Sequence, residues 1–258
     1  MRQLFNVLLA AICFWRWPRL YKQYVNKVTT SGYIGTPSRI VMFFARWFCR
    51  FLTWVWVGRV QVVGEENLHQ GERVIVTPNH SSLLDAILMY AMMTREVWAI
   101  GADDVLKKCF GIIGVIATKM RTMPVDRTHG STVIEPATNL VLAGKSLLMF
   151  PEGRISVTGE LLPYKKGAAV IGRLAMLRLR EAGKNARVGI VVTAIIYNQR
   201  DPDSALNYFK MGLKWRKGAT IVYCPPIWLD ELDGLDIDAV MDLVRTKMEA
   251  ALATGKPA

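Results

Sequence analysis

The hydrophobic and polar positions of the chain follow two patterns that meet near residue 59. Beyond that point, short apolar runs suited to β-strands alternate with longer stretches of helical periodicity. The expected strands are residues 59–63, 74–77, 97–100, 146–150, 188–196 and 220–224, and the expected helices are residues 83–93, 132–143, 168–182 and 237–252. Strands separated by helices are typical of an α/β fold with a mixed, largely parallel sheet flanked by helices. The polar residues 198–217 are expected to form a loop or an edge insertion.

The N-terminal region contains two apolar runs that are bounded or interrupted by basic residues. Residues 3–15 are too few for a membrane span, which needs about 20. Arg16 and Trp17 follow this run in place of a small-residue cleavage site, so a removable signal peptide is not expected. Residues 37–57 are long enough to form a helix across a bilayer, and Thr36 followed by Pro37 suits a helix start.

The second run carries its polar residues on one side. At about 100° per residue, a single narrow face holds Arg39, Arg46, Arg50 and Thr53. The other sides are apolar from Ile40 onward, which predicts an interfacial helix whose basic stripe faces lipid phosphates. Two alternatives remain: the apolar side packs on the core of the protein, or the helix spans the membrane.

Composition narrows the class of protein. The chain has 258 residues, of which 52% are hydrophobic, so it can bury a large core and is not disordered. Its four cysteines include no Cys-x-x-Cys pair, which argues against a disulfide scaffold or zinc module and favours a reducing compartment. The 33 Lys and Arg residues exceed the 21 Asp and Glu residues, and the net charge of +12 suits nucleic acid or an anionic membrane.

The position of the charge distinguishes these two partners. Residues 1–64 hold nine Lys or Arg residues, no Asp or Glu, and five of the eight tryptophans. Basic residues and tryptophan in an acid-free apolar segment are typical of a bilayer interface, whereas a nucleic-acid-binding protein would carry its basic residues on the folded body. We therefore expect membrane-associating basic helices in residues 1–58, an α/β domain in residues 59–258, and an anionic membrane rather than nucleic acid as partner.

One of the three histidines has a setting that suggests chemistry. His80 follows the expected strand 74–77 and precedes the expected helix 83–93, and in open α/β sheets ligands bind where strands end. Asp85 meets His80 if the histidine lies in the loop and the aspartate in the first helical turn. The carboxylate would then accept the imidazole N–H and leave the other ring nitrogen as a base. A non-catalytic histidine beside a helix-start aspartate is the alternative.

Four sequence blocks carry a resemblance to a known family. Residues 79–85 (Asn-His-Ser-Ser-Leu-Leu-Asp) resemble the His-x4-Asp signature of glycerolipid acyltransferases, the family of 1-acyl-glycerol-3-phosphate acyltransferases. Residues 123–127 end in Asp-Arg, residues 150–153 read Phe-Pro-Glu-Gly, and residues 162–168 contain Tyr-Lys-Lys-Gly-Ala; each is similar to a block of that family, in the same order. In this chain Arg154 directly follows Gly153, whereas the family usually has Gly-Thr-Arg. The resulting Phe-Pro-Glu-Gly-Arg-Ile sequence is similar to that of 2-acylglycerophosphoethanolamine acyltransferases. This departure leaves the head group of the acceptor open.

The resemblance implies transfer of a fatty acyl group from acyl-CoA or acyl carrier protein to a lysophospholipid hydroxyl, with lysophosphatidate as the favoured acceptor. His80 and Asp85 would be catalytic and no cofactor or metal would be needed. The acceptor would be bound by Arg127, Glu152, Gly153, Arg154 and Lys166. We expect backbone N–H groups near the start of helix 83–93 to stabilise the oxyanion. The enzyme would lie on the membrane surface facing the cytoplasm. A thioesterase or lipid hydrolase, and a non-catalytic membrane-binding protein, are the competing functions.

Overall fold

The computed structural model describes residues 17–31, 37–68, 72–107, 112–156, 158–198 and 216–257. Its strands are β1 (Val60–Val63), β2 (Arg73–Pro78), β3 (Val97–Ala102), β4 (Thr122–Val125), β5 (Ser146–Leu148), β6 (Val188–Tyr197), β7 (Ala219–Tyr223) and β8 (Ile227–Trp228). Its α-helices are α2 (Trp17–Ser31), α3 (Arg39–Trp56), α4 (Leu84–Met92), α5 (Asp103–Leu106), α6 (Ile112–Lys119), α7 (Ile134–Leu142), α8 (Gly167–Glu181) and α9 (Ile237–Thr254). The apolar run 3–15 and nearly all of the expected loop 198–217 lie outside the described residues.

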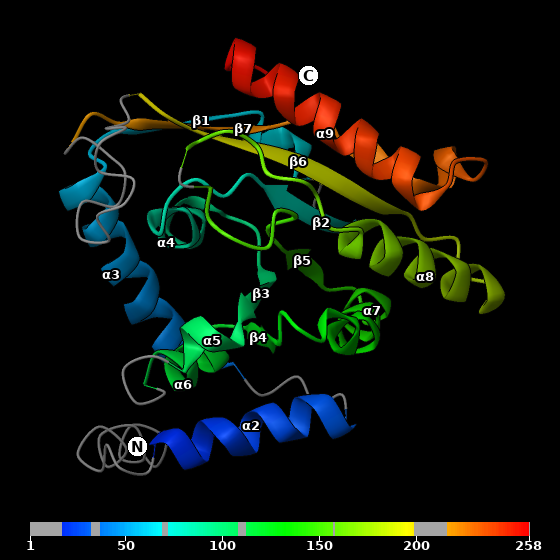
Figure 1. Ribbon diagram of the computed structural model, residues 1–258, viewed down its shortest axis with the longest axis horizontal. Coiled ribbons are helices and arrows are strands. Elements are labelled where there is room, and N and C mark those ends of the chain that lie inside the picture. Colours follow the sequence, from blue (N-terminus) through cyan, green and yellow to red (C-terminus); the bar gives the residue numbers. More distant parts are fainter. Residues whose placement is uncertain are drawn as a thin grey trace.

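The strands form one mixed sheet in the order β1-β7-β6-β2-β5-β3-β4, with β8 beside β6 (Figure 1). Strand β6 runs antiparallel to β7 and β8, and the other described pairings are parallel. The prediction of a mixed, largely parallel sheet flanked by helices is therefore confirmed. All six expected strands and all four expected helices of the body are present, each with small shifts of its ends.

Sequence patterns did not predict α5, α6, β4 and β8. Strand β4 contains Pro124, which cannot donate to a strand ladder and counts against a central strand. The structure places β4 at the edge of the sheet, where it pairs only with β3 in the described part of the chain. An edge strand tolerates proline because one side of its backbone needs no partner.

Alternation along the central strands divides the core into two layers. Val74 and Val76 of β2 pack in a cluster with Leu84 and Leu88 of α4, on one face of the sheet. Ile75 points to the opposite face, where a larger cluster includes apolar side chains of α7, α8 and α9. Successive residues of a strand point to opposite faces, so a strand buried on both sides reads as a continuous apolar run. Helices accordingly cover both faces of the sheet (Figure 1).

The connections that follow the adjacent parallel strands β2 and β5 lie on opposite faces of the sheet. Strand β2 leads into α4, which lies on one face, whereas β5 leads into α8 on the other. A crevice forms at the carboxyl ends of strands whose connections diverge in this way, and ligands of open α/β sheets bind there. The loops that follow β2 and β5 contain His80 and the Phe-Pro-Glu-Gly block, so the topology brings the two blocks together.

Helix α3 confirms the expected helix but corrects its start and its orientation. The helix begins at Arg39, and the Ser38 hydroxyl caps it by accepting a hydrogen bond from the Val41 N–H at 3.4 Å. The expected basic stripe faces the protein: Arg46 donates to the Met93 carbonyl and the Arg50 Nε donates to the Ala91 carbonyl at 3.1 Å.

The physical reason for this orientation lies at the carboxyl end of α4. The last carbonyls of a helix have no partner within the helix and carry partial negative charge, so guanidinium groups bind them well. Thr53 and Cys49 are buried on the same inner side. The prediction that the basic stripe faces lipid phosphates is therefore wrong for Arg46 and Arg50. The apolar side of α3 does not pack on the core formed by the described residues.

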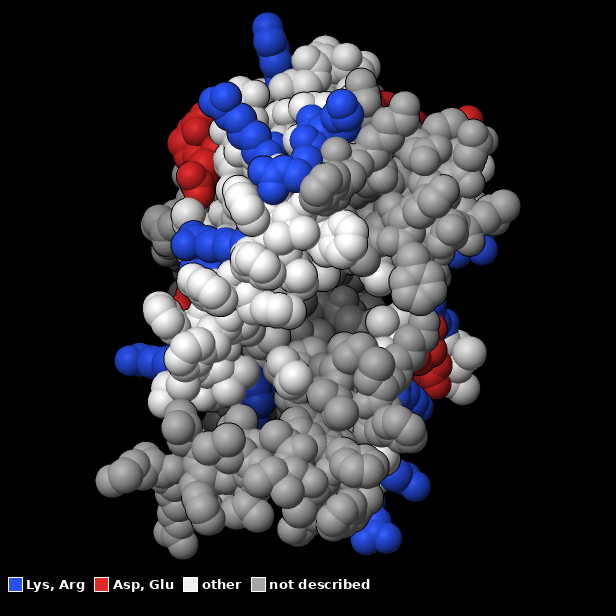
Figure 2. Space-filling model, turned by 90° about the vertical axis from the view of Figure 1, so that its left-hand side faces the viewer, with Lys and Arg blue, Asp and Glu red and all other residues white. Residues whose placement is uncertain are grey.

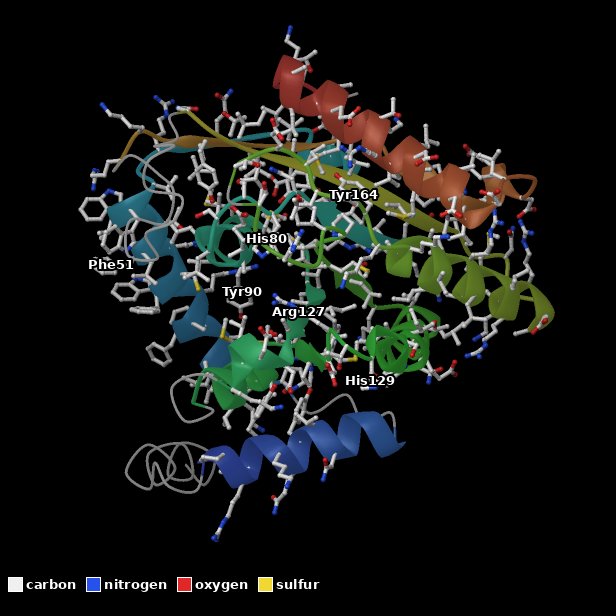
Figure 3. The ribbon with its side chains drawn as sticks, viewed as in Figure 1. Phe51, His80, Tyr90, Arg127, His129 and Tyr164 are labelled. Atoms are coloured by element: carbon white, nitrogen blue, oxygen red, sulfur yellow. The ribbon has the colours of Figure 1, made fainter. Side chains whose placement is uncertain are left out.

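The outer side of α3 is a continuous apolar surface. Its side chains are between 46% and 68% exposed, and we call this set the aromatic face: Ile40, Phe43, Phe44, Trp47, Phe48, Phe51 and Trp54. In Figure 2 the described part of this side is largely uncharged, with charged side chains mainly toward its margins, and in Figure 3 Phe51 points away from the body. Within the described residues, no helix is long and apolar enough to span a bilayer.

Helix α2 packs beside α6. The Tyr21 ring lies over Gly114, where an added Cβ would approach the ring to 2.4 Å, and the Tyr21 hydroxyl donates to Asp103 Oδ1 at 2.7 Å. Burial and this neighbouring carboxylate raise the pKa of Tyr21, so the phenol keeps its proton. A glycine in α6 thus allows the close approach of α2, whose Arg19 and Lys22 remain exposed.

Candidate active site

The site forms where the loops after β2 and β5 meet. The His80 N–H donates to Glu152 Oε1 at 2.7 Å, and the His80 carbonyl accepts from the Ser156 N–H at 2.7 Å. These two hydrogen bonds join the His-x4-Asp block to the Phe-Pro-Glu-Gly block through the backbone of His80 itself. The imidazole ring then stacks on Phe150, with 4.0 Å between ring centroids. The ring is therefore fixed in position before any substrate binds.

The predicted contact between His80 and Asp85 is present. His80 Nδ1 lies 3.0 Å from Asp85 Oδ2, with His80 in the loop and Asp85 in the first turn of α4. The carboxylate is fully buried, whereas the His80 side chain keeps 14% of its surface exposed. With Nδ1 bound to the carboxylate, Nε2 makes no hydrogen bond to any residue that the structure describes. This is the arrangement that a general base requires.

The start of α4 explains how a buried carboxylate is accommodated. Asp85 Oδ2 also accepts the backbone N–H groups of Ser81 at 2.6 Å and Ser82 at 2.8 Å. Hydrogen bonds from N–H groups and the positive end of the helix dipole both stabilise an anion there. A buried charge held by several donors avoids most of the desolvation penalty that it would otherwise suffer.

These contacts correct one expectation. We expected backbone N–H groups at the start of α4 to bind the oxyanion of the reaction intermediate. Those of Ser81 and Ser82 are bound by Asp85, that of His80 is bound by Glu152, and that of Leu84 binds the Ser82 hydroxyl at 3.2 Å. Because these four donors already have partners within the protein, they are not free for an oxyanion, and the prediction is wrong for them.

Glu152 connects two loops. Its side chain is only 4% exposed, and Oε2 accepts the Leu162 N–H at 3.0 Å while Oε1 binds His80. Burial raises the pKa of Glu152, although the two N–H donors and the nearby His80 partly oppose that effect. The guanidinium of Arg245, on α9, in turn donates to the Leu162 carbonyl at 3.0 Å. Both carboxylate oxygens thus bind backbone amides of the protein.

Gly153 has a conformational and a steric reason to be glycine. Its φ of +67° lies in the left-handed region, and its N–H closes a turn onto the Phe150 carbonyl at 3.1 Å. An added Cβ would lie 2.8 Å from Lys165 Cε, because the Lys165 side chain crosses the turn. The exposed side chains of Arg154 and Lys165 therefore lie at this turn, and neither forms an ion pair with another described residue.

The other two predicted cationic residues are paired with carboxylates. Lys166 Nζ lies 2.7 Å from Asp238 Oδ2, where α8 begins beside α9. Arg127, just after β4, lies 3.1 Å from Asp104 Oδ2, and in the view of Figure 3 it is labelled between His80 and His129. Ion pairs this exposed contribute little free energy, about 0–1 kcal/mol, so an anionic ligand can replace the carboxylate.

The predicted site residues thus fall into two groups. Hydrogen bonds and chain continuity join one group: His80, Asp85, Glu152, Gly153 and Arg154. Arg127 and Lys166 have no described contact with that group, since each is paired with a carboxylate of another element.

Sequence reasoning missed two residues in contact with His80 and Asp85. Phe150 stacks on the imidazole, and the Tyr197 hydroxyl donates to Asp85 Oδ1 at 2.6 Å. Phe150 belongs to one of the four sequence blocks, but its contact depends on the loop geometry. Tyr197 lies 112 residues after Asp85, at the end of β6, and only the pairing of β6 with β2 places it there. Among the described residues, no group of His, Cys, Asp and Glu is arranged to hold a metal ion.

Comparison with known proteins identifies the family of the chain. The family model described as Acyltransferase matches residues 59–197. A 1-acyl-sn-glycerol-3-phosphate acyltransferase of Cocos nucifera is 33% identical over 123 residues, or 46% of this chain and 38% of its own. A lyso-ornithine lipid O-acyltransferase of Brucella abortus is 29% identical over 184 residues, or 70% of this chain and 64% of its own. The chain therefore spans less than two thirds of the length of each of these relatives.

The fold also has a counterpart among solved structures. The crystal structure of the 1-acyl-sn-glycerophosphate (LPA) acyltransferase of Thermotoga maritima matches with a TM-score of 0.58 and covers 98% of this chain and 97% of its own. At 18% sequence identity this similarity supports the fold alone. The family match covers more than half of the chain and contains His80, Asp85, Glu152 and Tyr197. The chain belongs to the acyltransferase family.

Proposed function

We propose that the protein moves a fatty acyl group from a thioester to the free hydroxyl of a lysophospholipid. The thioester is carried by coenzyme A or by acyl carrier protein. Lysophosphatidate is the acceptor that the names of the relatives favour. The observation that carries the proposal is the His80 imidazole, which is bound through Nδ1 to the buried Asp85 and leaves Nε2 without a described partner. The acceptor supplies the nucleophile, so the protein needs no covalent intermediate.

The reaction then follows from this geometry. His80 Nε2 removes the proton from the acceptor hydroxyl while its oxygen attacks the thioester carbonyl. The tetrahedral intermediate collapses, the C–S bond breaks, and the imidazolium returns the proton to the leaving thiolate. Asp85 holds the ring in the tautomer with the proton on Nδ1 and stabilises the imidazolium between the two steps. The acyl group moves from sulfur to oxygen, one proton moves from oxygen to sulfur, and His80 is restored.

Cationic side chains at the Gly153 turn and in the loop after β4 supply the proposed site for the acceptor phosphate. We assign Arg154 and Arg127 to it, since guanidinium groups bind phosphate in a bidentate manner. Lys165 lies at the same turn, whereas Lys166 is paired with Asp238, so we propose Lys165 in addition and retain Lys166 as the alternative. Glu152 and Gly153 shape this site by holding the turn rather than by contacting the phosphate through their side chains.

The catalytic loops operate beside a membrane in this proposal. The aromatic face of α3 is the surface that enters the bilayer interface, where aromatic side chains are favoured. Arg39 is exposed at its N-terminal end, and Arg59, Arg216 and Lys217 are exposed at its C-terminal end, suited to anionic head groups. Residues 1–58 form the membrane-associating part and residues 59–258 the acyltransferase domain. The protein lies on the cytoplasmic surface, where it meets its thioester donor.

An assay with purified protein tests the reaction and identifies the acceptor. Wild type, His80→Ala and Asp85→Asn are incubated with an acyl thioester and with lysophosphatidate, lysophosphatidylethanolamine or lyso-ornithine lipid. We expect diacyl product with wild type and a loss of about 10²–10⁴-fold in kcat/KM for His80→Ala. Equal product from His80→Ala would overturn the catalytic assignment. Thioester loss without diacyl product would show a thioesterase instead.

The phosphate site has its own comparison. Arg154→Ala, Lys165→Ala and Lys166→Ala are assayed for the KM of the lysophospholipid. We expect the first two to raise KM by about tenfold each, the usual loss for a charge-assisted hydrogen bond. If Lys166→Ala raised KM more than Lys165→Ala did, Lys166 would be the lysine that binds the phosphate.

A further inference from the structure

The two oxygens of Asp85 have different partners. Oδ2 accepts from His80 and from the N–H groups of Ser81 and Ser82, all of which belong to the same loop and helix start. Oδ1 accepts from the hydroxyl of Tyr197 at 2.6 Å, and this bond is buried. Tyr197 is thus the one described partner of Asp85 that comes from outside its own segment of chain. Its hydroxyl determines the rotation of the carboxylate about its last side-chain bond.

The sheet places this hydroxyl with little freedom. Strand β2 ends at Pro78, opposite Thr193 of β6. The side chain of Asn79 then continues the ladder: its Nδ2 donates to the Ile195 carbonyl at 3.1 Å, and its Oδ1 accepts the Ile195 N–H at 2.7 Å. Tyr197 comes two residues later, so its side chain lies on the same face of the sheet as that of Ile195. Both side chains belong to the core cluster under α4.

The chemistry gives this contact a purpose beyond packing. An ionised carboxylate accepts about four hydrogen bonds, and Asp85 has four such contacts when that of Tyr197 is included. Three of them converge on Oδ2, so Oδ1 would remain buried without a described donor if the phenol hydroxyl were removed. A carboxylate that has lost the one donor to its second oxygen is held less firmly in one rotation, and it also attracts the proton of the imidazolium more strongly.

We propose that Tyr197 is a positioning residue of the acyltransferase, acting on His80 through Asp85. The inference rests on the proposed function, because it requires His80 to be the base. Tyr197 touches no reacting atom; it holds the carboxylate in the plane that keeps the imidazole tautomer and orientation correct. The first consequence is a lower kcat with little change in KM, since substrate binding does not involve the phenol.

A matched control lies on the neighbouring strand. Tyr223 of β7 is 1% exposed, belongs to the same core cluster, and its buried hydroxyl has no hydrogen-bond partner among the described residues. Tyr197→Phe and Tyr223→Phe therefore remove the same atom from the same layer of the core. A change that appears in the first variant alone is specific to the Tyr197 hydroxyl, and the Asp85→Asn background then assigns it to the bond with Asp85.

The test is a kinetic cycle on the purified full chain with Tyr197→Phe, Tyr223→Phe, Asp85→Asn and the double variant Tyr197→Phe/Asp85→Asn. We expect Tyr197→Phe to lower kcat about 10- to 100-fold, the range for a hydrogen bond to a charged group. In the Asp85→Asn background the same change should have a much smaller effect, because the charged acceptor of the bond is already absent.

The pH profile supplies a second readout. The acidic limb of kcat/KM for Tyr197→Phe should move to higher pH, because the freed carboxylate of Asp85 holds the imidazolium proton of His80 more tightly. Glu152 is the other carboxylate that faces His80 and Asp85, and it is unchanged in every variant of the cycle. Tyr223→Phe should leave the profile where it is in wild type.

Three results would overturn the inference. They are a kcat equal to that of Tyr223→Phe, a loss as large in the Asp85→Asn background as in the wild-type background, and a change in KM alone. If His80→Ala remained active, the proposed function itself would fail. If His80→Ala were inactive and Tyr197→Phe were normal, only the role of Tyr197 would fail.

Discussion

Helices α3 and α9 have the same length, 18 residues, and opposite orientations of their apolar sides. The buried positions of α9 are all apolar: Val240, Met241, Val244, Met248 and Ala251. The buried positions of α3 are Cys49 and Thr53, and its large aromatic side chains point outward. Helix α9 is an ordinary amphipathic helix whose polar side faces water. The exposed apolar side of α3 supports the membrane contact proposed above.

The largest effect is expected from changing the aromatic face. The triple variant Phe44→Ser/Trp47→Ser/Phe51→Ser should lose at least about 100-fold in affinity for anionic vesicles, because each buried aromatic side chain contributes roughly 1.5–3 kcal/mol. Sedimentation with vesicles measures this. Leu177→Ser is the control, since Leu177 is a comparably exposed apolar residue of α8. Unchanged binding of the triple variant would mean that the membrane is contacted elsewhere.

The second prediction compares stability in the two helices. Met248→Ala in α9 should lower the free energy of unfolding by about 2–5 kcal/mol, because Met248 is fully buried in the core. Phe44→Ala in α3 should lower it by less than about 0.5 kcal/mol in the absence of lipid, as for other exposed positions. Urea denaturation in lipid-free buffer measures both. Similar losses would show that the aromatic face packs on the protein and that the contrast between the helices is wrong.

The smallest effects separate the two kinds of arginine in α3. Arg50→Ala removes a donor from the α4 carbonyl of Ala91 and should lower the free energy of unfolding by about 1–2 kcal/mol. Arg39→Ala should leave stability unchanged, because Arg39 is exposed and has no side-chain partner among the described residues, but should weaken vesicle binding by about 1 kcal/mol. Thermal denaturation and vesicle binding are measured for both. If Arg50→Ala weakened vesicle binding and left stability unchanged, Arg50 would face lipid, as the sequence had predicted.

Much of the candidate site could be predicted from the sequence because its signals are local. His80 and Asp85 are five residues apart, and a loop followed by a helix start is enough to bring them together. The strands of the body were recognisable because they are apolar on both faces. Tyr197 carried no such signal, since a tyrosine at the end of an apolar strand is common and its partner depends on strand order.

The orientation of α3 could not be predicted from the sequence either, because it depends on a contact with another helix. Helical periodicity shows which residues share a face, and it grouped Arg46, Arg50 and Thr53 correctly. It does not show which face meets the protein. That depends on the carboxyl end of α4, whose carbonyls offer the partners that lipid phosphates were expected to offer. The occupied N–H groups at the start of α4 were missed in the same way, because the Asp85 side chain folds back to bind them.

If the aromatic face of α3 enters a bilayer, as proposed, the folding of the chain and its binding to lipid are linked equilibria. Its polar side is bound to α4 by hydrogen bonds and its aromatic face is exposed, so only the folded chain presents both surfaces correctly. A lipid surface that binds the folded chain alone stabilises it by about 2.7 kcal/mol when lipid is present at about 100 times the dissociation constant. Lipid then acts as a ligand of the native state. Removing residues 1–58 would consequently remove the two arginine donors that bind the end of α4, the helix that carries Asp85, as well as the proposed membrane contact.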